Sequence, residues 1–346
     1  MQPRPIVQVG VNPDGIGSAW LAAITASPDW TLAGVVDTDP GHRALAAEST
    51  GLSTGQCFET IDDAVRAVEC VALALVVPSP LHEQLCRQAL GAGQHVVIEK
   101  PFTLDVASAR GLVDLAGTRG LVLAVNQNYR YLRVMRALRR LVRASTIGTI
   151  DSVAVSFDVS WPGRPYQWSM AHPMLYEMAI HHLDALRDVL GTEALTASGH
   201  TWRPRWTRYA GDTVVACSFE FEGSVEAIYR GSLDSPGRPT PWPGVWRIEG
   251  ERGALHLDDL GAGYGLYVTR GPDTVERVEP DGDGYDDQGA AVAGTLHELA
   301  TALREGRRPQ SDGRDNLRTL AMASAVACSS AEGRIVDITA EFFPLM

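Results

Sequence analysis

The order of apolar and polar residues divides the chain into two parts of different character. The first 125 residues alternate short, almost continuous apolar runs with stretches whose apolar positions recur at helical spacing. The runs that predict strands are Ile6–Val9, Leu32–Val36, Val71–Val77, Val96–Ile98 and Leu121–Val125. The stretches that predict helices are Ser18–Ala26, Ala44–Ala47, Leu81–Leu90 and Leu104–Ala116. Strands without polar alternation are buried on both faces, so residues 1–125 predict an α/β domain with a doubly wound parallel sheet.

The second part, residues 126–346, has a different pattern. Strands with partial alternation, separated by Gly- and Pro-rich turns, are predicted at Val153–Val159, Asp212–Phe221, Ser224–Ser232, Trp246–Glu249 and Ala254–Asp258. Helices are predicted at Leu175–Leu190, which stops before Gly191, and at Ala290–Arg304 and Asn316–Glu332. This part therefore predicts an α+β domain with a large, mostly antiparallel sheet.

Composition narrows the range of partners. The net charge of −12 argues against a nucleic acid or an anionic membrane as a partner. The five cysteines form no C-x-x-C pair, which favours reduced thiols over disulfides or a zinc site. No apolar run reaches the roughly 18 residues that span a bilayer, and the chain enters its first strand without a secretory leader. We therefore expect a cytoplasmic protein.

A glycine cluster follows the first predicted strand, where a Rossmann dinucleotide fingerprint belongs. Either Asn12 replaces the middle glycine of G-x-G-x-x-G, or the loop is two residues longer and ends at Gly17. The second register is better supported, because Asp37 ends the next strand 20 residues later, the distance expected for a carboxylate that binds the adenine ribose. The residues predicted to line the cofactor here are Gly10, Asn12, Gly15, Ile16, Gly17 and Asp37. An acidic side chain repels a 2′-phosphate, so NAD is favoured over NADP, although Asp37 could instead be a simple helix cap.

Lysine usage singles out one further position. Of the 30 basic residues only Lys100 is a lysine, and it lies in Glu99-Lys100-Pro101 after the strand Val96–Ile98. An ammonium can share or release a proton when it is buried, whereas a guanidinium stays charged. Lys100 is thus a candidate for proton chemistry, against the alternative of an ordinary surface lysine.

Several motifs together resemble one family. Pro78-Ser-Pro-Leu-His82 and Glu99-Lys-Pro101 both follow parallel strands, at the sheet edge where ligands bind. With the glycine loop and Asp37, the chain resembles the glucose–fructose oxidoreductase and inositol dehydrogenase family. Further matching segments, which extend the resemblance over essentially the whole length, are Asn128–Tyr131, Ile147–Ile150, Glu177–Asp184 and Ala325–Val336.

The resemblance implies a catalytic set. Lys100 matches the family's substrate-contacting lysine and His181 the histidine of a D-x-x-x-H pair, in which Glu177 replaces the usual aspartate. Residues four apart on a helix share a face, so Glu177 can orient the imidazole of His181, a natural base for an alcohol proton. A core histidine is the alternative for His181. The further residues assigned to the cofactor are Pro78, Ser79, His82, Glu99, Lys100, Pro101 and Asn128.

Aromatic residues near the predicted catalytic helix suit the C–H face of a sugar ring, although they could equally belong to the core. The substrate candidates just before this helix are Trp161, Trp168 and His172. Tyr129 is a further candidate, because it follows the position where the first predicted domain leads into the second. No metal site is predicted, because Glu177, His181 and His182 have no further ligand at a recognised spacing.

The resulting expectation is an NAD-dependent dehydrogenase acting on a secondary alcohol of a sugar, cyclitol or polyol. The alternatives are a reductase of a nucleotide-linked or secondary-metabolite keto-sugar and a non-catalytic dinucleotide-binding sensor. The resemblance also implies a homo-oligomer, a dimer or tetramer, built through the large sheet of the C-terminal domain.

Overall fold

The computed structural model describes residues 2–271, 273–280 and 282–344, and the chain folds as two compact units. The first unit contains the chain up to Asn128 together with Asp287–Leu317. The second unit contains Tyr129–Asp286 and the residues from Arg318 onward. Within the described residues, no helix is both long and apolar enough to cross a membrane.

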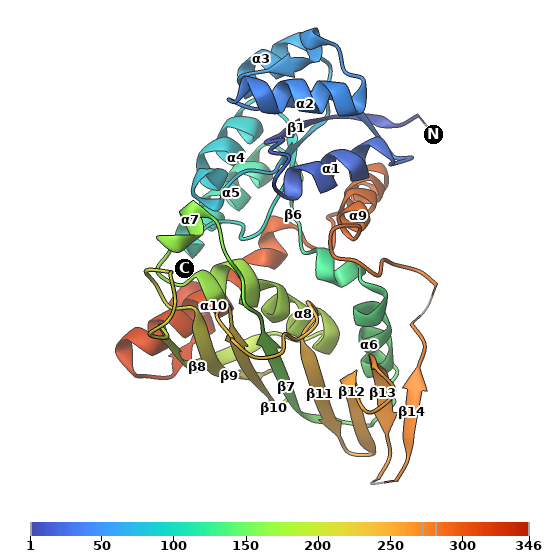
Figure 1. Ribbon diagram of the computed structural model, residues 1–346, viewed down its shortest axis with the longest axis vertical. Coiled ribbons are helices and arrows are strands. Elements are labelled where there is room, and N and C mark those ends of the chain that lie inside the picture. The colour runs from blue at the N-terminus through green and yellow to red at the C-terminus, as the bar shows by residue number, and fades with distance from the viewer. Residues whose placement is uncertain (1, 272, 281, 345–346) are drawn as a thin grey trace. The chain divides into compact units, whose positions relative to one another are not determined.

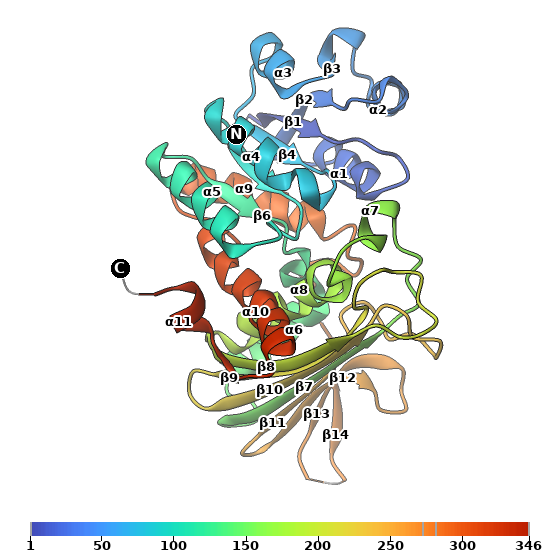
Figure 2. The ribbon, with the colours of Figure 1, turned by 90° about the vertical axis from the view of Figure 1, so that its left-hand side faces the viewer.

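The first unit is built on a parallel sheet with helices on both faces (Figure 2). Its elements are β1 Arg4–Val9, α1 Ile16–Thr25, β2 Trp30–Val36, α2 Pro40–Thr50, β3 Cys57–Phe58, α3 Ile61–Ala67, β4 Ala72–Leu75, α4 His82–Gly91, β5 His95–Ile98, α5 Val106–Thr118, β6 Leu123–Val125 and α9 Val292–Glu305. Among the described residues the strand order is β3-β2-β1-β4-β5-β6, and every pairing is parallel. This is the order of a doubly wound dinucleotide fold, which confirms the expected architecture.

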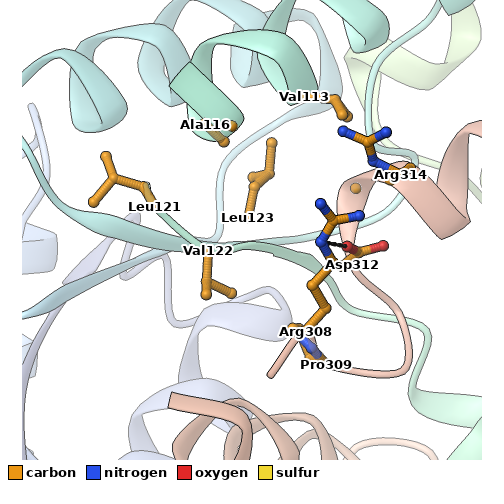
Figure 3. Close-up of a pocket in the computed structure, with 11 residues that line it drawn as sticks. Val113, Ala116, Leu121, Val122, Leu123, Arg308, Pro309, Asp312 and Arg314 are labelled. Atoms are coloured by element: carbon orange, nitrogen blue, oxygen red, sulfur yellow. Dashed lines mark ion pairs between the residues drawn. The ribbon is translucent and has the colours of Figure 1, made fainter. Parts of the chain in front are cut away.

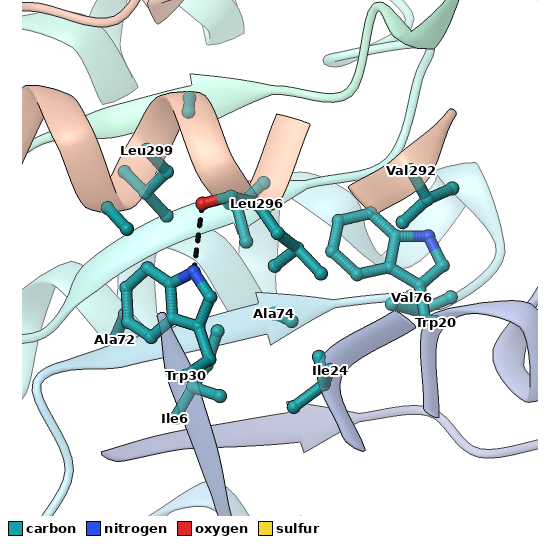
Figure 4. Packing of buried hydrophobic residues seen from close by; sticks show 13 residues of the cluster. Ile6, Trp20, Ile24, Trp30, Ala72, Ala74, Val76, Val292, Leu296 and Leu299 are labelled. Carbon is teal, nitrogen blue, oxygen red and sulfur yellow. Dashed lines mark hydrogen bonds between the residues drawn. The ribbon is translucent and has the colours of Figure 1, made fainter. Parts of the chain in front are cut away.

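The segment Asp287–Leu317 extends the first unit beyond the linear boundary expected from the sequence. Helix α9 packs against α1 and covers an apolar cluster that includes Trp20, Trp30 and Leu296 (Figure 4). The Trp30 indole donates a hydrogen bond to the Leu296 carbonyl at 2.8 Å. The domain boundary expected from the sequence, between residues 125 and 126, assigned this segment to the second domain. The segment packs on the first unit because the sheet face above β1 and β4 needs an apolar cover.

The second unit is built on a larger sheet, one face of which carries helices (Figure 1). Its elements are α6 Arg133–Arg143, β7 Ile150–Asp158, α7 Pro165–Trp168, a π-helical turn Met174–Ala179, α8 Ile180–Leu190, β8 Ala194–Trp202, β9 Val214–Phe221, β10 Val225–Ser232, β11 Val245–Gly250, β12 Gly253–Asp259, β13 Tyr264–Thr269, β14 Val275–Val278, β15 Val336–Asp337 and α11 Ile338–Phe342. Helix α10, Gly313–Glu332, continues from the first unit into the second.

In the part of the chain that the structure describes, the strand order of this sheet is β14-β13-β12-β11-β7-β10-β9-β8-β15. All neighbours are antiparallel except β7 and β10. The large, mostly antiparallel sheet is therefore confirmed. The expected helix Leu175–Leu190 differs in one respect, because its first turns are π-helical before α8 begins at Ile180. Single π-helical turns inside helices are frequent at functional sites.

Candidate functional site

The glycine loop between β1 and α1 is held by a side chain from beneath. The buried Gln8 donates from Nε2 to the carbonyls of Gly10 and Gly17, at 2.9 Å each. Gly10 has a φ of +86°, and a Cβ there would lie 2.2 Å from the Val76 carbonyl oxygen. Gly17 falls in the first turn of α1, and its Cβ would lie 2.9 Å from the Asn12 carbonyl oxygen. Both positions therefore require glycine for the loop to keep this path.

Asp37 stands at the end of β2, and its carboxylate is oriented by the backbone. Oδ2 accepts from the Val11 N–H at 2.9 Å, and Oδ1 accepts from the Asp39 N–H at 3.0 Å. His42 Nδ1 is 3.4 Å from Oδ1. Asp37 is thus fixed beside the glycine loop, and the helix cap proposed as the alternative is made by Asp39 instead.

The turn after β4 is tied to the turn after β5. His82 is buried, with Nδ1 2.7 Å from the Pro101 carbonyl oxygen and Nε2 2.9 Å from the Val77 carbonyl oxygen. Pro78 is exposed, and Ser79 is buried with an Oγ that has no hydrogen-bond partner among the described residues. The structure therefore shows His82 fastening these two turns together.

Glu99 at the end of β5 is held by protein donors. Oε1 accepts from Trp20 Nε1 at 2.6 Å and from Asn126 Nδ2 at 2.8 Å, and Oε2 accepts from the Lys100 backbone N–H at 3.1 Å. Lys100 is partly exposed and forms a cis peptide bond with Pro101. A direct contact of Glu99 with the cofactor stays a prediction, since the contacts seen here are to the protein.

These features fit a dinucleotide. The glycine-containing loop that leads into the ten-residue helix α1 suits a pyrophosphate, because backbone N–H groups and the helix dipole attract anions. Two buried polar oxygens that follow β4 and β6 have no partner among the described residues: the hydroxyl oxygen Ser79 Oγ and the amide oxygen Asn128 Oδ1, which only accepts. Asn128 Nδ2 donates to the Gln288 carbonyl at 2.7 Å, so its amide is already oriented.

In the second unit, His181 lies in the first turn of α8, buried and stacked on an aromatic ring. The rings of His181 and Tyr129 are 4.4 Å apart with an interplanar angle of 10°. The Tyr129 hydroxyl donates to the Trp242 carbonyl at 3.1 Å, and burial raises the pKa of Tyr129 above its usual range. Tyr129 is thus a fixed, neutral platform for the imidazole and not an open sugar-binding surface.

Glu177 lies in the π-helical turn and is anchored by a residue that the sequence reasoning missed. Gln167, from the short helix α7, donates from Nε2 to Glu177 Oε2 at 2.9 Å. Its own Oε1 accepts from the Arg164 N–H at 2.8 Å, which fixes the orientation of the amide. Both Gln167 and Glu177 are at least nine-tenths buried. No sequence signal marked Gln167, because it lies ten residues away in a separate element.

The other aromatic candidates divide between the interior and the surface. Trp161 packs edge-on against Trp242, with ring centroids 5.6 Å apart. Trp168 is exposed and donates from Nε1 to the Pro162 carbonyl at 3.0 Å. His172 Nδ1 is 3.6 Å from Asp212 Oδ2. Trp161 Nε1 also donates to Gln167 Oε1 at 3.5 Å, so Trp161 contacts the residue that anchors Glu177.

Two further residues of the matched motif have structural surroundings. Asp184 receives two hydrogen bonds of 2.7 Å from Arg130, in a pair that is almost fully buried. Thr319 also donates to Asp184, at 3.0 Å. This bidentate pair joins the chain after Tyr129 to α8 and agrees with a structural role for both residues.

A small cavity in the first unit is separate from all of these residues. It lies between α5, β6 and the segment 308–314, and its lining includes Arg308 and Arg314 (Figure 3). Its volume is about 60 Å³, far below the roughly 300 Å³ at which ligand pockets begin. It cannot hold a dinucleotide.

Comparison with known proteins places the chain in a family. Residues 6–127 match an oxidoreductase family described by its NAD-binding Rossmann fold, and residues 135–256 match the GFO/IDH/MocA C-terminal domain. A dTDP-3,4-didehydro-2,6-dideoxy-alpha-D-glucose 3-reductase from Streptomyces violaceoruber is 30% identical, over 88% of this chain and 86% of the relative. A D-apiose dehydrogenase from Paraburkholderia graminis is 29% identical, over 89% of this chain and 83% of the relative.

Solved structures show the same fold. An oxidoreductase from Agrobacterium radiobacter, crystallised with NAD+, L-tartaric acid and magnesium, superimposes with a TM-score of 0.87 at 21% identity, over 97% of this chain and 99% of that chain. Fold and site thus define an NAD-binding oxidoreductase. The chain belongs to the GFO/IDH/MocA oxidoreductase family.

Proposed function

We propose that this enzyme transfers a hydride between the nicotinamide of NAD and a secondary alcohol of a sugar, cyclitol or polyol. The observation that carries the proposal is a buried imidazole, that of His181, stacked on Tyr129 and preceded by four residues by the anchored carboxylate of Glu177. A histidine in such a setting serves as the base that an alcohol oxidation needs. The chain's only lysine, Lys100, follows the carboxyl end of strand β5 in the dinucleotide sheet.

The proposed roles follow from the chemistry of each group. NAD, when bound, supplies the hydride acceptor at C4 of its nicotinamide. His181 takes the proton of the substrate hydroxyl, and Glu177, held by Gln167, orients the imidazole. Lys100 donates a hydrogen bond to the same oxygen and stabilises the charge that develops there. In the reverse direction His181 returns the proton to a ketone oxygen.

Cofactor binding is proposed through the glycine loop. Backbone N–H groups of Ile16 and Gly17 at the start of α1 hold the pyrophosphate, while the Gly15 N–H closes the loop onto the Asn12 carbonyl at 3.3 Å. The fixed carboxylate of Asp37 accepts from the adenine-ribose hydroxyls. The 2′-phosphate of NADP would place its negative charge next to the carboxylate of Asp37, so NADP binds more weakly than NAD. Ser79 and Asn128 offer the remaining hydrogen-bonding atoms near the nicotinamide half.

A keto-sugar reductase is the second candidate. The relative from Streptomyces violaceoruber, named as a reductase of a dTDP-linked keto-sugar, favours it and matches most of this chain. The two candidates share the chemistry at the reacting carbon and differ in whether a nucleotide accompanies the sugar.

Assembly and location complete the proposal. We expect a homo-oligomer that forms through the face of the large sheet that carries Ala154, Ala216 and Ile228, the last of which is 58% exposed. Light scattering would report a monomer mass if this is wrong. All five cysteines are free thiols, which favours a reducing compartment such as the cytoplasm.

The test measures nicotinamide absorbance with a panel of sugars, cyclitols, polyols and dTDP-linked sugars, each with NAD and NADP. We expect turnover with NAD, and a loss of at least about 100-fold in Lys100→Met, because this variant removes a charged hydrogen-bond donor aimed at the reacting oxygen. NADH binding should persist. Lys100→Arg, which keeps the charge but cannot release a proton, is the matched control and should recover only part of the rate. Unchanged turnover in Lys100→Met would exclude this mechanism and favour a dinucleotide-binding sensor.

A further inference from the structure

Four polar side chains form a continuous chain inside the apolar core of the first unit. They are Trp20 on α1, Glu99 after β5, Asn126 after β6 and Thr295 on α9. None is more than 6% exposed, and Trp20 belongs to the apolar cluster that α1 and α9 share (Figure 4). A carboxylate at such a position costs several kcal/mol, about 3 or more, unless donors surround it.

The hydrogen bonds of this chain all point toward the carboxylate of Glu99. Thr295 Oγ1 donates to Asn126 Oδ1 at 2.6 Å, and Asn126 Nδ2 donates to Glu99 Oε1 at 2.8 Å. Trp20 Nε1 donates to the same Oε1 at 2.6 Å. The Thr295 hydroxyl therefore decides which way the Asn126 amide faces, because its proton requires the amide oxygen on that side.

The second carboxylate oxygen of Glu99 forms a hydrogen bond with the backbone of Lys100. Glu99 Oε2 accepts from the backbone N–H of Lys100 at 3.1 Å. A rotation of the Glu99 side chain would release this N–H and with it the backbone from which the lysine side chain starts. Three side chains, those of Thr295, Asn126 and Glu99, thus connect α9 to the backbone of Lys100.

We propose that Thr295, Asn126 and Trp20 are positioning residues for Lys100, acting through Glu99. The inference rests on the proposed role of Lys100 in catalysis. The inference also gives α9 a role in the reaction in addition to its role in the fold. This helix belongs to the first unit although it comes from a distant segment of the sequence. Trp20 lies three residues beyond Gly17, so the helix that follows the glycine loop and the lysine share one anchor. Misplacing a reacting group by about 1 Å can cost about 100-fold in rate.

The single lysine makes the test direct. Reductive methylation with ¹³C-formaldehyde labels Lys100 and the N-terminal amine only, so that one NMR signal reports the surroundings of the Lys100 side chain without any substrate. Thr295→Val removes the hydroxyl with little change of volume, and Thr295→Ser restores it. Thr301→Val is the matched control, because Thr301 lies on the same helix and accepts a hydrogen bond from Arg304.

We expect Thr295→Val to move the Lys100 signal and to lower kcat by about 10- to 100-fold with the first substrate found, while NADH affinity stays within about twofold. Thr295→Ser should return both values toward the parent, and Thr301→Val should change neither. The same signal and kcat in Thr295→Val and Thr301→Val would overturn the inference. Should Thr295→Val fail to fold, Trp20→Phe removes the indole donor while keeping an aromatic ring in the core, and it is held to the same criteria.

The NMR signal also separates this inference from the proposed function. Full turnover in Lys100→Met would remove the catalytic role of the lysine whatever the signal does. An inactive Lys100→Met, combined with a Lys100 signal that ignores Thr295, would leave the function intact and refute the positioning role alone.

Discussion

His182, next to the proposed base, gives a prediction about stability and pH. Its side chain is completely buried, with Nδ1 3.0 Å from the Tyr229 hydroxyl and Nε2 3.0 Å from the Trp242 carbonyl. Because a carbonyl only accepts, Nε2 carries the hydrogen and Nδ1 accepts from the tyrosine, which leaves the ring neutral. Burial, partly opposed by the bond to Trp242, lowers the pKa of His182 from 6.5 to about 4.

The difference between the pKa of His182 in the unfolded and the folded state determines how the free energy of unfolding changes with pH. The unfolded chain protonates His182 below pH 6.5, whereas the folded protein resists protonation down to about pH 4. The contribution is therefore fully present above pH 6.5 and is lost as the pH falls toward 4. The slope is about 1.4 kcal/mol per pH unit, so that about 2 kcal/mol is lost between pH 7 and pH 5.

The measurement is urea unfolding of the parent and of His182→Gln at pH 7 and pH 5, followed by circular dichroism. The parent should lose about 2 kcal/mol more than the variant over this interval. Any constant cost of the substitution cancels in the comparison, so only the pH dependence matters. His200→Gln, at an exposed histidine on β8, should behave like the parent. If the parent and His182→Gln lose the same stability, His182 is not a neutral core residue.

Two further predictions concern the buried ion pair and the glycine loop. Arg130→Met leaves the carboxylate of Asp184 buried without its bidentate partner, so calorimetry should show a loss of about 3–5 kcal/mol in the free energy of unfolding, or about 6–20 °C in Tm. Arg270→Met, which breaks an exposed ion pair, should cost no more than about 1 kcal/mol. Equal losses in the two variants would contradict the structural role of the buried pair. Gly10→Ala places a Cβ 2.2 Å from the Val76 carbonyl oxygen at a φ of +86°, and a fluorescence titration should show at least about tenfold weaker NADH binding; parental affinity would show that the loop tolerates a side chain.

The architecture could be predicted from the sequence because its signals are local. Apolar runs without alternation marked the five longer strands of the first sheet, and their alternation with helices predicted that the sheet is parallel. The strand Cys57–Phe58 was not among the expected elements, because two residues carry no periodicity. Helix α6 was not expected either, although its apolar positions recur at helical spacing between arginines.

The site could be predicted only in part, because its supporting contacts join residues far apart in the chain. Gln167 reaches Glu177 from a separate short helix, and Thr295 reaches Asn126 across 169 positions. Such contacts leave no trace in spacing or composition. The π-helical turn around Glu177 is a further case, since it depends on tertiary packing and not on a local signal.

The Glu-Lys-Pro motif shows how adjacent residues can serve different purposes. Sequence reasoning treated Glu99, Lys100 and Pro101 as one cofactor-facing group, because all three follow the same strand. The structure surrounds the carboxylate of Glu99 with three donors, and the carbonyl of Pro101 contacts His82. The two neighbours of the lysine are thus both committed to the protein interior. A flexible four-carbon side chain needs a fixed backbone to place its ammonium reproducibly, and the motif supplies that backbone from both sides.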